Sequence, residues 1–303
     1  MTDRIIDISD EPADLSIRNA NLIINSPSAG EVPVPLIDIA VVVASNPCIR
    51  LTHAVLSSLA EFGCAFISCD TKHLPAAMLL PIQQHFKQAG HFMHQVEAKQ
   101  PVKKRLWQEV VKAKVLAQAR LLELRNKDDC GLKVLASKVR SGDPDNIEAQ
   151  AARKYWPAVF KDPEFQRIPQ SGGANGVLDY GYAILRAITA RALCGAGLHP
   201  SIGIHHHNKL DAFCLADDVM EPSRPIVDLA VAGIVAEFGP GTFLDKQTKQ
   251  KLLLTLTGRF LANGEWRSLF DWMTKTAFSL ANVFSGKSHS LEIPEIADVR
   301  ANS

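Results

Sequence analysis

The sequence predicts an α+β protein, in which a small N-terminal β-sheet domain is followed by a larger all-helical domain. Two observations support this class. The first seventy-odd residues contain short runs rich in Ile and Val, broken by Pro, Gly, Asn and Asp. From Leu74 onward, apolar residues recur at helical spacing. We therefore expect a β domain over 1–75, a helical domain over 76–288 and a loose polar tail over 289–303.

The β domain is predicted from composition and turn residues. Asn19-Ala20-Asn21 is typical of a hairpin turn, because Asn tolerates positive φ. Thr52 to Glu61 is expected to form a short helix. The segments that we expect as strands are Arg4 to Ser9, Leu15 to Asn25, Val32 to Ala44 and Cys64 to Cys69.

The segment around Trp107 is predicted to be an amphipathic helix. Lys104, Gln108 and Lys112 lie opposite its apolar stripe, which consists of Leu106, Val110, Ala113, Ala117 and Leu121. From residue 99 to 140 there are twelve Lys or Arg and four acids, although the whole chain has a net charge of only +1. One basic stripe on a near-neutral protein fits phosphate contact along one face, or an ordinary solvated helix face.

Leu178 to Leu193 is predicted to form a helix that ends near Gly195 and Gly197. The preceding SGGANG segment, 171–176, lacks the Lys of a phosphate loop, and we expect a flexible connection there. The sequence also has no G-x-S-x-G or strand-linked G-x-G-x-x-G pattern.

Acidic side chains cluster on the predicted helix from Asp211 to Glu221. Helical spacing places Asp217, Asp218 and Glu221 within about a quarter of the circumference. Their repulsion could be relieved by a divalent cation, or by Lys209 or Arg224. Of the adjacent histidines 205–207, at most two can share one ligand with these acids. Carboxylates with imidazole suit Mg²⁺ or Mn²⁺. Zinc stays an alternative, although the zinc-protease pattern H-E-x-x-H is absent. A solvated acidic face without metal is the other alternative.

Glu148 belongs to a further predicted helix. Asp143 is placed to cap this helix before Pro144, and the buried stripe is expected to hold Ile147, Ala151 and Tyr155. Glu148 lies beside that stripe. From the surrounding residues alone, Glu148 is interpreted as an ordinary acid in the first turn of a helix, a position that the helix dipole favours.

Six scattered cysteines, without a C-x-x-C pair or an apolar N-terminal segment, indicate buried thiols in a reducing compartment. We therefore expect a cytoplasmic protein without a membrane segment. The longest apolar run, 37–45, is too short to cross a bilayer.

Several long segments resemble the CRISPR-associated integrase family, the "Cas one" proteins, in their type II form. The strongest is GIHHHNKLDAFCLADDVMEPSRPIVD at 203–228. The others, in chain order, are CDTKHLP at 69–75, KRLWQEVVKAKVLAQARLLE at 104–123, IEAQAARKYW at 147–156 and NGVLDYGYAILRA at 175–187.

This resemblance implies that Glu148, His206 and Glu221 are catalytic and hold Mg²⁺ or Mn²⁺, with Asp218 as a supporting acid. It also implies a β domain that mediates homodimerisation and a helical catalytic domain. The expected partners are double-stranded DNA and the small "Cas two" protein, in a heterohexamer-like assembly. Phosphates would meet the basic segment, in particular Lys103, Lys104, Arg105 and Lys112.

The implied reaction is a transesterification, in which a DNA 3′-hydroxyl attacks a phosphodiester at a CRISPR repeat and a new spacer is inserted. Two other classes remain open. One is a metal-dependent, structure-selective DNA nuclease or repair enzyme that uses water as the nucleophile. The other is an architectural DNA-binding protein without catalysis, which the acid cluster disfavours because unpaired acids repel phosphate.

Overall fold

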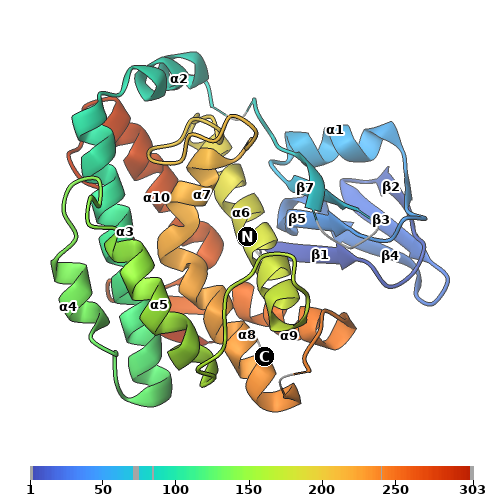
Figure 1. Cartoon of the computed structure of the whole chain (residues 1–303). Coiled ribbons are helices and arrows are strands. Elements are labelled where there is room, and N and C mark those ends of the chain that lie inside the picture. The colour runs from blue at the N-terminus through green and yellow to red at the C-terminus, as the bar shows by residue number, and fades with distance from the viewer. Residues whose placement is uncertain (1–2, 71–74, 84, 240, 301–303) are drawn as a thin grey trace.

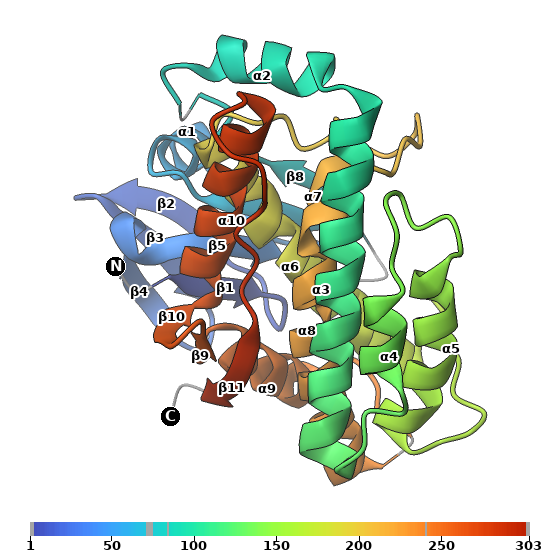
Figure 2. The same cartoon turned by 90° about the vertical axis from the view of Figure 1, so that its left-hand side faces the viewer.

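The protein folds into a β-sheet region beside a larger helical region, which confirms the α+β class (Figure 1). The computed structural model describes residues 3–70, 75–83, 85–239 and 241–300. Part of the CDTKHLP segment, residues 71–74, therefore lies outside the described residues. Two sheets form the β region, and the long helix α3 (Gln100–Asn126) spans the helical region, as Figure 2 shows.

The β region contains two four-stranded sheets. The first has the order β1-β5-β7-β8, with parallel pairing except between β7 and β8. The second has the order β4-β3-β2-β6. Helix α1 (His53–Glu61) lies beside them. The strands are β1 (Arg4–Ile8), β2 (Asp14–Arg18), β3 (Asn21–Ser26), β4 (Gly30–Pro35), β5 (Ile39–Ala44), β6 (Arg50–Leu51), β7 (Ala65–Cys69) and β8 (Pro75–Leu79).

The β2–β3 hairpin turns where the sequence predicted. Asn19 and Ala20 both have positive φ, of 49° and 56°, as expected for the central residues of a tight hairpin. Asn21 already pairs with Arg18 as the first residue of β3. The Asn21 side-chain nitrogen, Nδ2, donates to the Asn19 backbone carbonyl over 2.7 Å, which stabilises the turn.

The sheet that contains β5 separates two hydrophobic cores. Val41 and Val43 belong to the large core of the helical region, whereas Val42 belongs to the smaller core of the β region. In β7, Ala65 and Ile67 face the helices, and Phe66 faces the β core. This alternation is the two-residue period of a strand that is buried on both faces.

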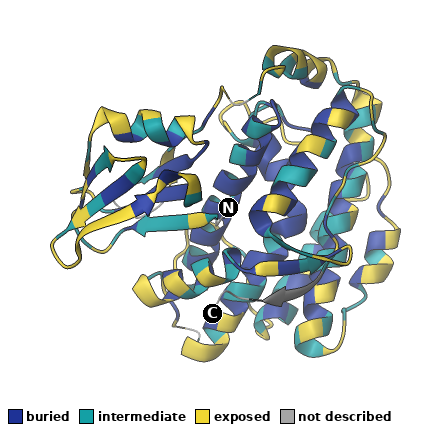
Figure 3. Cartoon of the chain, turned by 180° about the vertical axis from the view of Figure 1, so that it is seen from behind, coloured by how far each residue is buried: buried dark blue, intermediate teal, exposed yellow. Residues whose placement is uncertain are grey.

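The other helices of the helical region surround α6, which is largely buried. Figure 3 shows many buried residues in the helices of this region. Helix α6 lies against β5, β7 and β8 on one side and against α8 and α10 on the other. Besides α3, the helices are α2 (Gln88–Glu97), α4 (Leu132–Ser137), α5 (Ile147–Phe160), α6 (Gly173–Gly195), α7 (Cys214–Met220), α8 (Arg224–Phe238), α9 (Lys246–Leu256) and α10 (Leu269–Phe284).

Helices α6 and α8 approach closely at Gly181. A Cβ atom at this position would lie 2.5 Å from the Val227 Cγ1 atom. On the same helix, the Tyr180 hydroxyl donates to Asp7 of β1 over 2.7 Å. Helix α6 therefore connects the β region to the helices that carry the candidate site.

The structure differs from the sequence prediction in several boundaries. The SGGANG segment is not a loose connection, because α6 starts within it at Gly173. Helix α5 starts at Ile147 rather than at Pro144, and α7 starts at Cys214 rather than at Asp211. These short leading segments instead form turns that their Asp and Asn side chains cap.

A small third sheet accompanies the helices, in the order β10-β9-β11. Its strands are β9 (Arg259–Ala262), β10 (Glu265–Ser268) and β11 (Ile296–Arg300). Strand β11 lies in the segment that we expected to be a loose tail, and β8 extends past the expected boundary at residue 75. The division into functional domains stays a prediction.

All six cysteines are free thiols. Cys64, Cys194 and Cys214 are buried as predicted, Cys69 and Cys130 are half-buried, and Cys48 is exposed, so the prediction of burial is wrong for Cys48. Within the described ranges, no helix is both long and apolar enough to cross a membrane.

Candidate functional site

Glu148 and Glu221 meet at a single positive charge, the ammonium group of Lys114. The Lys114 Nζ atom lies 2.6 Å from Glu148 Oε1 and 2.5 Å from Glu221 Oε2. Burial by itself lowers the pKa of Lys114, but the charges of Glu221 and Glu148 outweigh it and raise that pKa. Two of the three predicted catalytic residues, 73 positions apart in the sequence, therefore contact one cation.

Capping interactions position Glu148 in the first turn of α5. The Asn146 side chain accepts from the Ala149 amide, and Asp143 accepts from the amides of Ile147 and Glu148. These bonds satisfy amides that have no partner inside the helix. The predicted capping role of Asp143 is thus found, although the N-cap residue is Asn146. The first turn projects the Glu148 carboxylate toward α3.

Glu221 is almost fully buried, with 5% of its side chain exposed. Burial tends to raise its pKa, but Arg224 and Lys114 together hold the pKa below its usual value. The Arg224 Nε atom lies 3.0 Å from Glu221 Oε1, the carboxylate oxygen that Lys114 does not contact. The guanidinium carbon of Arg224 also lies 4.7 Å from the centre of the Tyr182 ring. Glu221 is therefore ionised and held between two cations.

A buried hydrogen-bond network holds α5, α6 and α8 together beneath these carboxylates. Asp228 on α8 accepts from the Tyr155 hydroxyl of α5 over 2.6 Å, and from the Tyr182 hydroxyl of α6. Burial raises the pKa of Asp228 to about 6, although both tyrosine bonds lower it. Because α5 also carries Glu148, this network connects the two carboxylate-bearing segments.

Asp218 organises the histidine loop, which is the segment between α6 and α7 that carries His205, His206 and His207. Its fully buried carboxylate accepts from the backbone amides of Ile204 and His205 and contacts His206 Nδ1 at 2.5 Å. This hydrogen bond raises the pKa of His206 and outweighs the effect of burial, which lowers it. When His206 is neutral, donation from Nδ1 leaves the Nε2 lone pair free to bind a cation.

The three adjacent histidines have different surroundings. The His205 ring stacks on Trp107 of α3 at 4.2 Å between ring centres, and His206 meets the same indole edge-on. His207 instead lines a cavity on the outer side of the loop. Only His206 contacts Asp218 through its side chain. This arrangement agrees with the prediction that the three imidazoles cannot all face one site.

The predicted acid cluster on α7 is divided among three partners. Asp217 forms a two-pronged ion pair with Arg186 at 2.7 and 2.8 Å. Asp218 binds the histidine loop, and Glu221 binds Arg224 and Lys114. The alternative of relief by Arg224 therefore holds for Glu221. Asp217 has a structural role in this arrangement.

Within the described residues, no three His, Cys, Asp or Glu side chains are close enough to hold a metal ion as they stand. The donor set nevertheless suits Mg²⁺ or Mn²⁺, with two carboxylates and an imidazole nitrogen. Glu221 Oε2 is buried without a hydrogen bond of good geometry, although the Lys114 ammonium lies 2.5 Å away. A spherical cation satisfies such an oxygen without a directional requirement, so the residues fit a divalent ion.

Some residues of the basic segment form ion pairs within the protein, and others are exposed without one. Arg105 pairs with Glu109, and Arg140 pairs with Asp145. Lys104 and Lys112 are exposed, and Lys103 is half-buried. In the part of the chain that the structure describes, these three lysines form no ion pair. They are therefore available to an outside anion.

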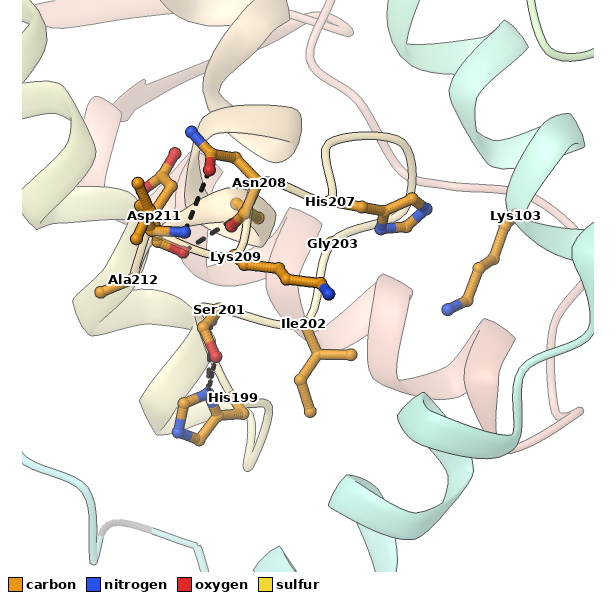
Figure 4. Close-up of a pocket in the computed structure, with 12 residues that line it drawn as sticks. Lys103, His199, Ser201, Ile202, Gly203, His207, Asn208, Lys209, Asp211 and Ala212 are labelled. Carbon is orange, nitrogen blue, oxygen red and sulfur yellow. Dashed lines mark hydrogen bonds between the residues drawn. The ribbon is translucent and has the colours of Figure 1, made fainter.

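An open cavity of about 600 Å³ lies beside the histidine loop, between α3 and the segment 199–214. In the close-up of Figure 4, Lys209 and Lys103 extend toward one another from opposite sides, with His207 near Lys103. Leu210, which also lines it, is 95% exposed. A cavity with two ammonium groups and an exposed apolar side chain suits a phosphate-bearing, partly apolar ligand such as a nucleotide.

Sequence analysis did not single out Lys114, although its position carried a signal. The predicted stripe of α3 included Ala113 and Ala117, which are only half-buried. The buried face is displaced from it and contains Val111, Val115 and Gln118. Lys114 is three residues after Val111 and four before Gln118, so it shares their face. A lysine on a buried helix face requires a partner, which identifies it as a candidate site residue.

Fold and site together define an α+β protein with a charged centre where α3, α5, α7 and the histidine loop meet. The sequence model of the family described as "CRISPR associated protein Cas1" matches residues 6–266. The chain therefore belongs to the Cas1 family of CRISPR-associated proteins.

Individual proteins show the same similarity. The "CRISPR-associated endonuclease Cas1" of Neisseria meningitidis serogroup C is 36% identical over 289 residues, which are 94% of each chain. A solved structure described as "Casposase bound to integration product" has a TM-score of 0.77 at 19% identity, over 95% of this chain and 92% of the other. A "Cas6-RT-Cas1--Cas2 complex" chain has a TM-score of 0.73 at 18% identity, over 95% and 35%. The type II subtype stays a prediction from the sequence motifs.

Proposed function

We propose that this protein is a metal-dependent integrase of CRISPR adaptation, which inserts short duplex DNA at the CRISPR repeat. The observation that carries the proposal is that Glu148 and Glu221 both contact the ammonium group of Lys114, in the same region as the His206–Asp218 pair. The family membership and the casposase with its integration product support the same class of reaction.

In this proposal Glu148, His206 and Glu221 hold Mg²⁺ or Mn²⁺, and Asp218 orients His206. When bound, the cation supplies Lewis acidity, which favours an ionised 3′-hydroxyl and stabilises the charge that develops at the phosphodiester. The protein's own residues orient the groups. Asp218 holds the Nδ1 proton of His206 so that the Nε2 lone pair stays free for the cation, and the Asn146 and Asp143 caps fix the start of α5.

The DNA strands are proposed to lie along the exposed side of α3. Lys104 and Lys112 would neutralise backbone phosphates, and Lys103 with Lys209 would hold a strand end in the cavity beside His207. Such contacts bind without reading sequence and weaken as salt rises. Arg105 is proposed as a further contact at the same face, next to its partner Glu109.

The proposed partners follow from the family and its structural relatives. The small "Cas two" protein is one, because the complex that shares this fold contains Cas1 with Cas2. Homodimerisation through the β region, in a heterohexamer-like assembly, is the other part of this proposal. Size-exclusion chromatography with light scattering, on the chain alone and with its partner, measures both.

A nuclease that uses water is the second candidate, because the Neisseria meningitidis relative is named an endonuclease. The purely architectural DNA-binding protein is disfavoured, because the Neisseria meningitidis relative, 36% identical over 94% of each chain, is named an endonuclease.

A branched DNA substrate distinguishes integrase from nuclease. An integrase run backwards releases the flap and joins the interrupted target strand, so a 5′-labelled target strand becomes longer on a denaturing gel. A nuclease releases the flap but leaves the labelled strand at its original length or shorter, because attack by water gives no joined product. Longer labelled products in Mg²⁺ or Mn²⁺ support the integrase. Release of the flap without any lengthening of the labelled strand, in both metals, would assign the nuclease.

A further inference from the structure

The charge that Glu148 and Glu221 share in this structure comes from the protein itself. Only 13% of the Lys114 side chain is exposed, and its neighbours on the inner face of α3 are buried. The ammonium donates a hydrogen bond to Glu148 and contacts Glu221 without hydrogen-bond geometry. It therefore occupies the space between the same two oxygens that a metal ion would need.

We propose that Lys114 is the resident cation of the metal-free site and that a divalent ion must displace its ammonium group. Lys114 would thereby set how tightly the site binds metal. This inference rests on the proposed function, because it takes Glu148 and Glu221 as metal ligands.

The charge balance supports displacement rather than joint occupancy. Two carboxylates, Glu148 and Glu221, face two cations, Lys114 and Arg224, so these four groups sum to zero. A divalent ion added to all four would leave two uncompensated positive charges in a largely buried site. Uncompensated buried charge is costly. Departure of one ammonium removes half of that excess.

Lys114 rather than Arg224 is the group that can leave. Arg224 lies on the far oxygen of Glu221, without hydrogen-bond geometry at Nε, and over the Tyr182 ring. Its departure would therefore not vacate the space between Glu148 Oε1 and Glu221 Oε2. Lys114 lies on the near oxygen and ends a flexible four-carbon side chain, with Glu148, which is 27% exposed, as its outer partner. Displacement thus leaves the Glu221–Arg224 pair intact and frees Glu148 Oε1 and Glu221 Oε2.

The test is Mn²⁺ binding to the full chain without DNA, measured by calorimetry and by the electron paramagnetic resonance signal of free Mn²⁺. Lys114→Met, which keeps the length but not the charge, is expected to lower the Kd for Mn²⁺ by roughly tenfold or more, because no competing cation remains. Lys154→Met, which removes an exposed lysine of α5, is the matched control and should bind Mn²⁺ as the wild type does.

Unchanged or weaker Mn²⁺ binding by a folded Lys114→Met protein would overturn the inference, since Lys114 would then assist the metal or play no part. If Lys114→Met does not fold, Lys114→Gln takes its place with the same expectation. Lys114→Arg, which keeps a cation, should not tighten binding, and tightening there would also count against displacement.

Glu148→Gln separates this inference from the proposed function. If Glu148→Gln binds Mn²⁺ as the wild type does, Glu148 is not a ligand and the proposed site itself is wrong. If Glu148→Gln weakens binding but Lys114→Met does not tighten it, the metal site stands and only the displacement of Lys114 is rejected.

Discussion

The hydroxyl of Tyr155 donates a buried hydrogen bond of 2.6 Å to Asp228 and so links α5 to α8. Tyr155 lies two turns after Glu148 on α5, and Asp228 is seven residues after Glu221. The distance between the two carboxylates therefore depends on a contact that touches neither of them.

Tyr155→Phe is expected to lower the free energy of unfolding by about 1–3 kcal/mol, because Asp228 loses a buried donor. Strand joining should also fall, since Glu148 is no longer fixed relative to Glu221. Urea unfolding and the branched-DNA assay measure the two effects. Tyr180→Phe, which breaks the bond to Asp7 instead, is the control: it should lose stability and retain the joining rate of the remaining folded protein. Equal loss of joining in both variants would contradict the link.

Asp228 predicts a pH-dependent stability. Its pKa in the folded protein is raised by burial to about 6, from an ordinary value of 3.8. The folded state thus binds this proton more tightly than the unfolded chain does. The resulting stabilisation is full below pH 4 and is lost as the pH rises through 6.

Asp228→Asn removes this titration. Relative to the wild type, the variant should gain stability between pH 4 and pH 7, on the order of 3 kcal/mol in total. Urea unfolding at several pH values in this window gives the difference directly. A constant difference across the window would show that Asp228 does not change its protonation there.

The candidate ligands predict unequal losses among neighbouring residues. Glu148→Gln, Glu221→Gln and His206→Ala should each abolish joining within detection, whereas His207→Ala should retain most of it. His205→Ala should reduce the joining rate by a smaller factor, because it removes the ring that stacks on Trp107. His205→Phe, which keeps a ring, should restore that rate. Initial rates in Mn²⁺ give the comparison. Equal losses at all three histidines would instead indicate a structural role for the loop.

Asp218 is expected to act through His206. Asp218→Asn keeps the size of the side chain but weakens the hold on Nδ1, and joining should fall roughly 10–100-fold, as for residues that orient a metal ligand. Mn²⁺ affinity should fall with it. Circular dichroism checks the fold, because the same carboxylate also binds two loop amides. Unchanged Mn²⁺ affinity in a folded variant would exclude this positioning role.

The exposed lysines of α3 predict the salt dependence of DNA binding. Lys104→Gln and Lys112→Gln should each lower the slope of log affinity against log salt by roughly 0.9, if each meets one phosphate of duplex DNA. Fluorescence anisotropy at several salt concentrations measures the slope. Lys246→Gln on α9 makes the same charge change beside Asp10 and should leave the slope unchanged. Equal slopes in all three variants would show that Lys104 and Lys112 do not contact DNA phosphates.

Local features of the sequence determined the fold class. The Ile- and Val-rich runs became strands, the Asn19–Ala20 turn formed, and the apolar spacing after residue 74 became helices, because strand and helix periods depend only on near neighbours. Boundaries were less accurate. At Pro144 and Asp211 the chain forms side-chain-capped turns before the helix begins, and such turns compete with a helix on nearly equal terms.

The family resemblance identified Glu148, His206, Glu221 and Asp218 as candidates, but what each side chain contacts was decided by the tertiary structure. Asp217, Asp218 and Glu221 are close in sequence and yet have different partners. Asp217 pairs with Arg186, Asp218 binds the histidine loop, and Glu221 contacts Lys114. Lys114 becomes part of the site only because α3 packs against both α5 and the turn after α7. A buried charge takes its partner from whichever element packs against it, and that partner can lie anywhere along the chain.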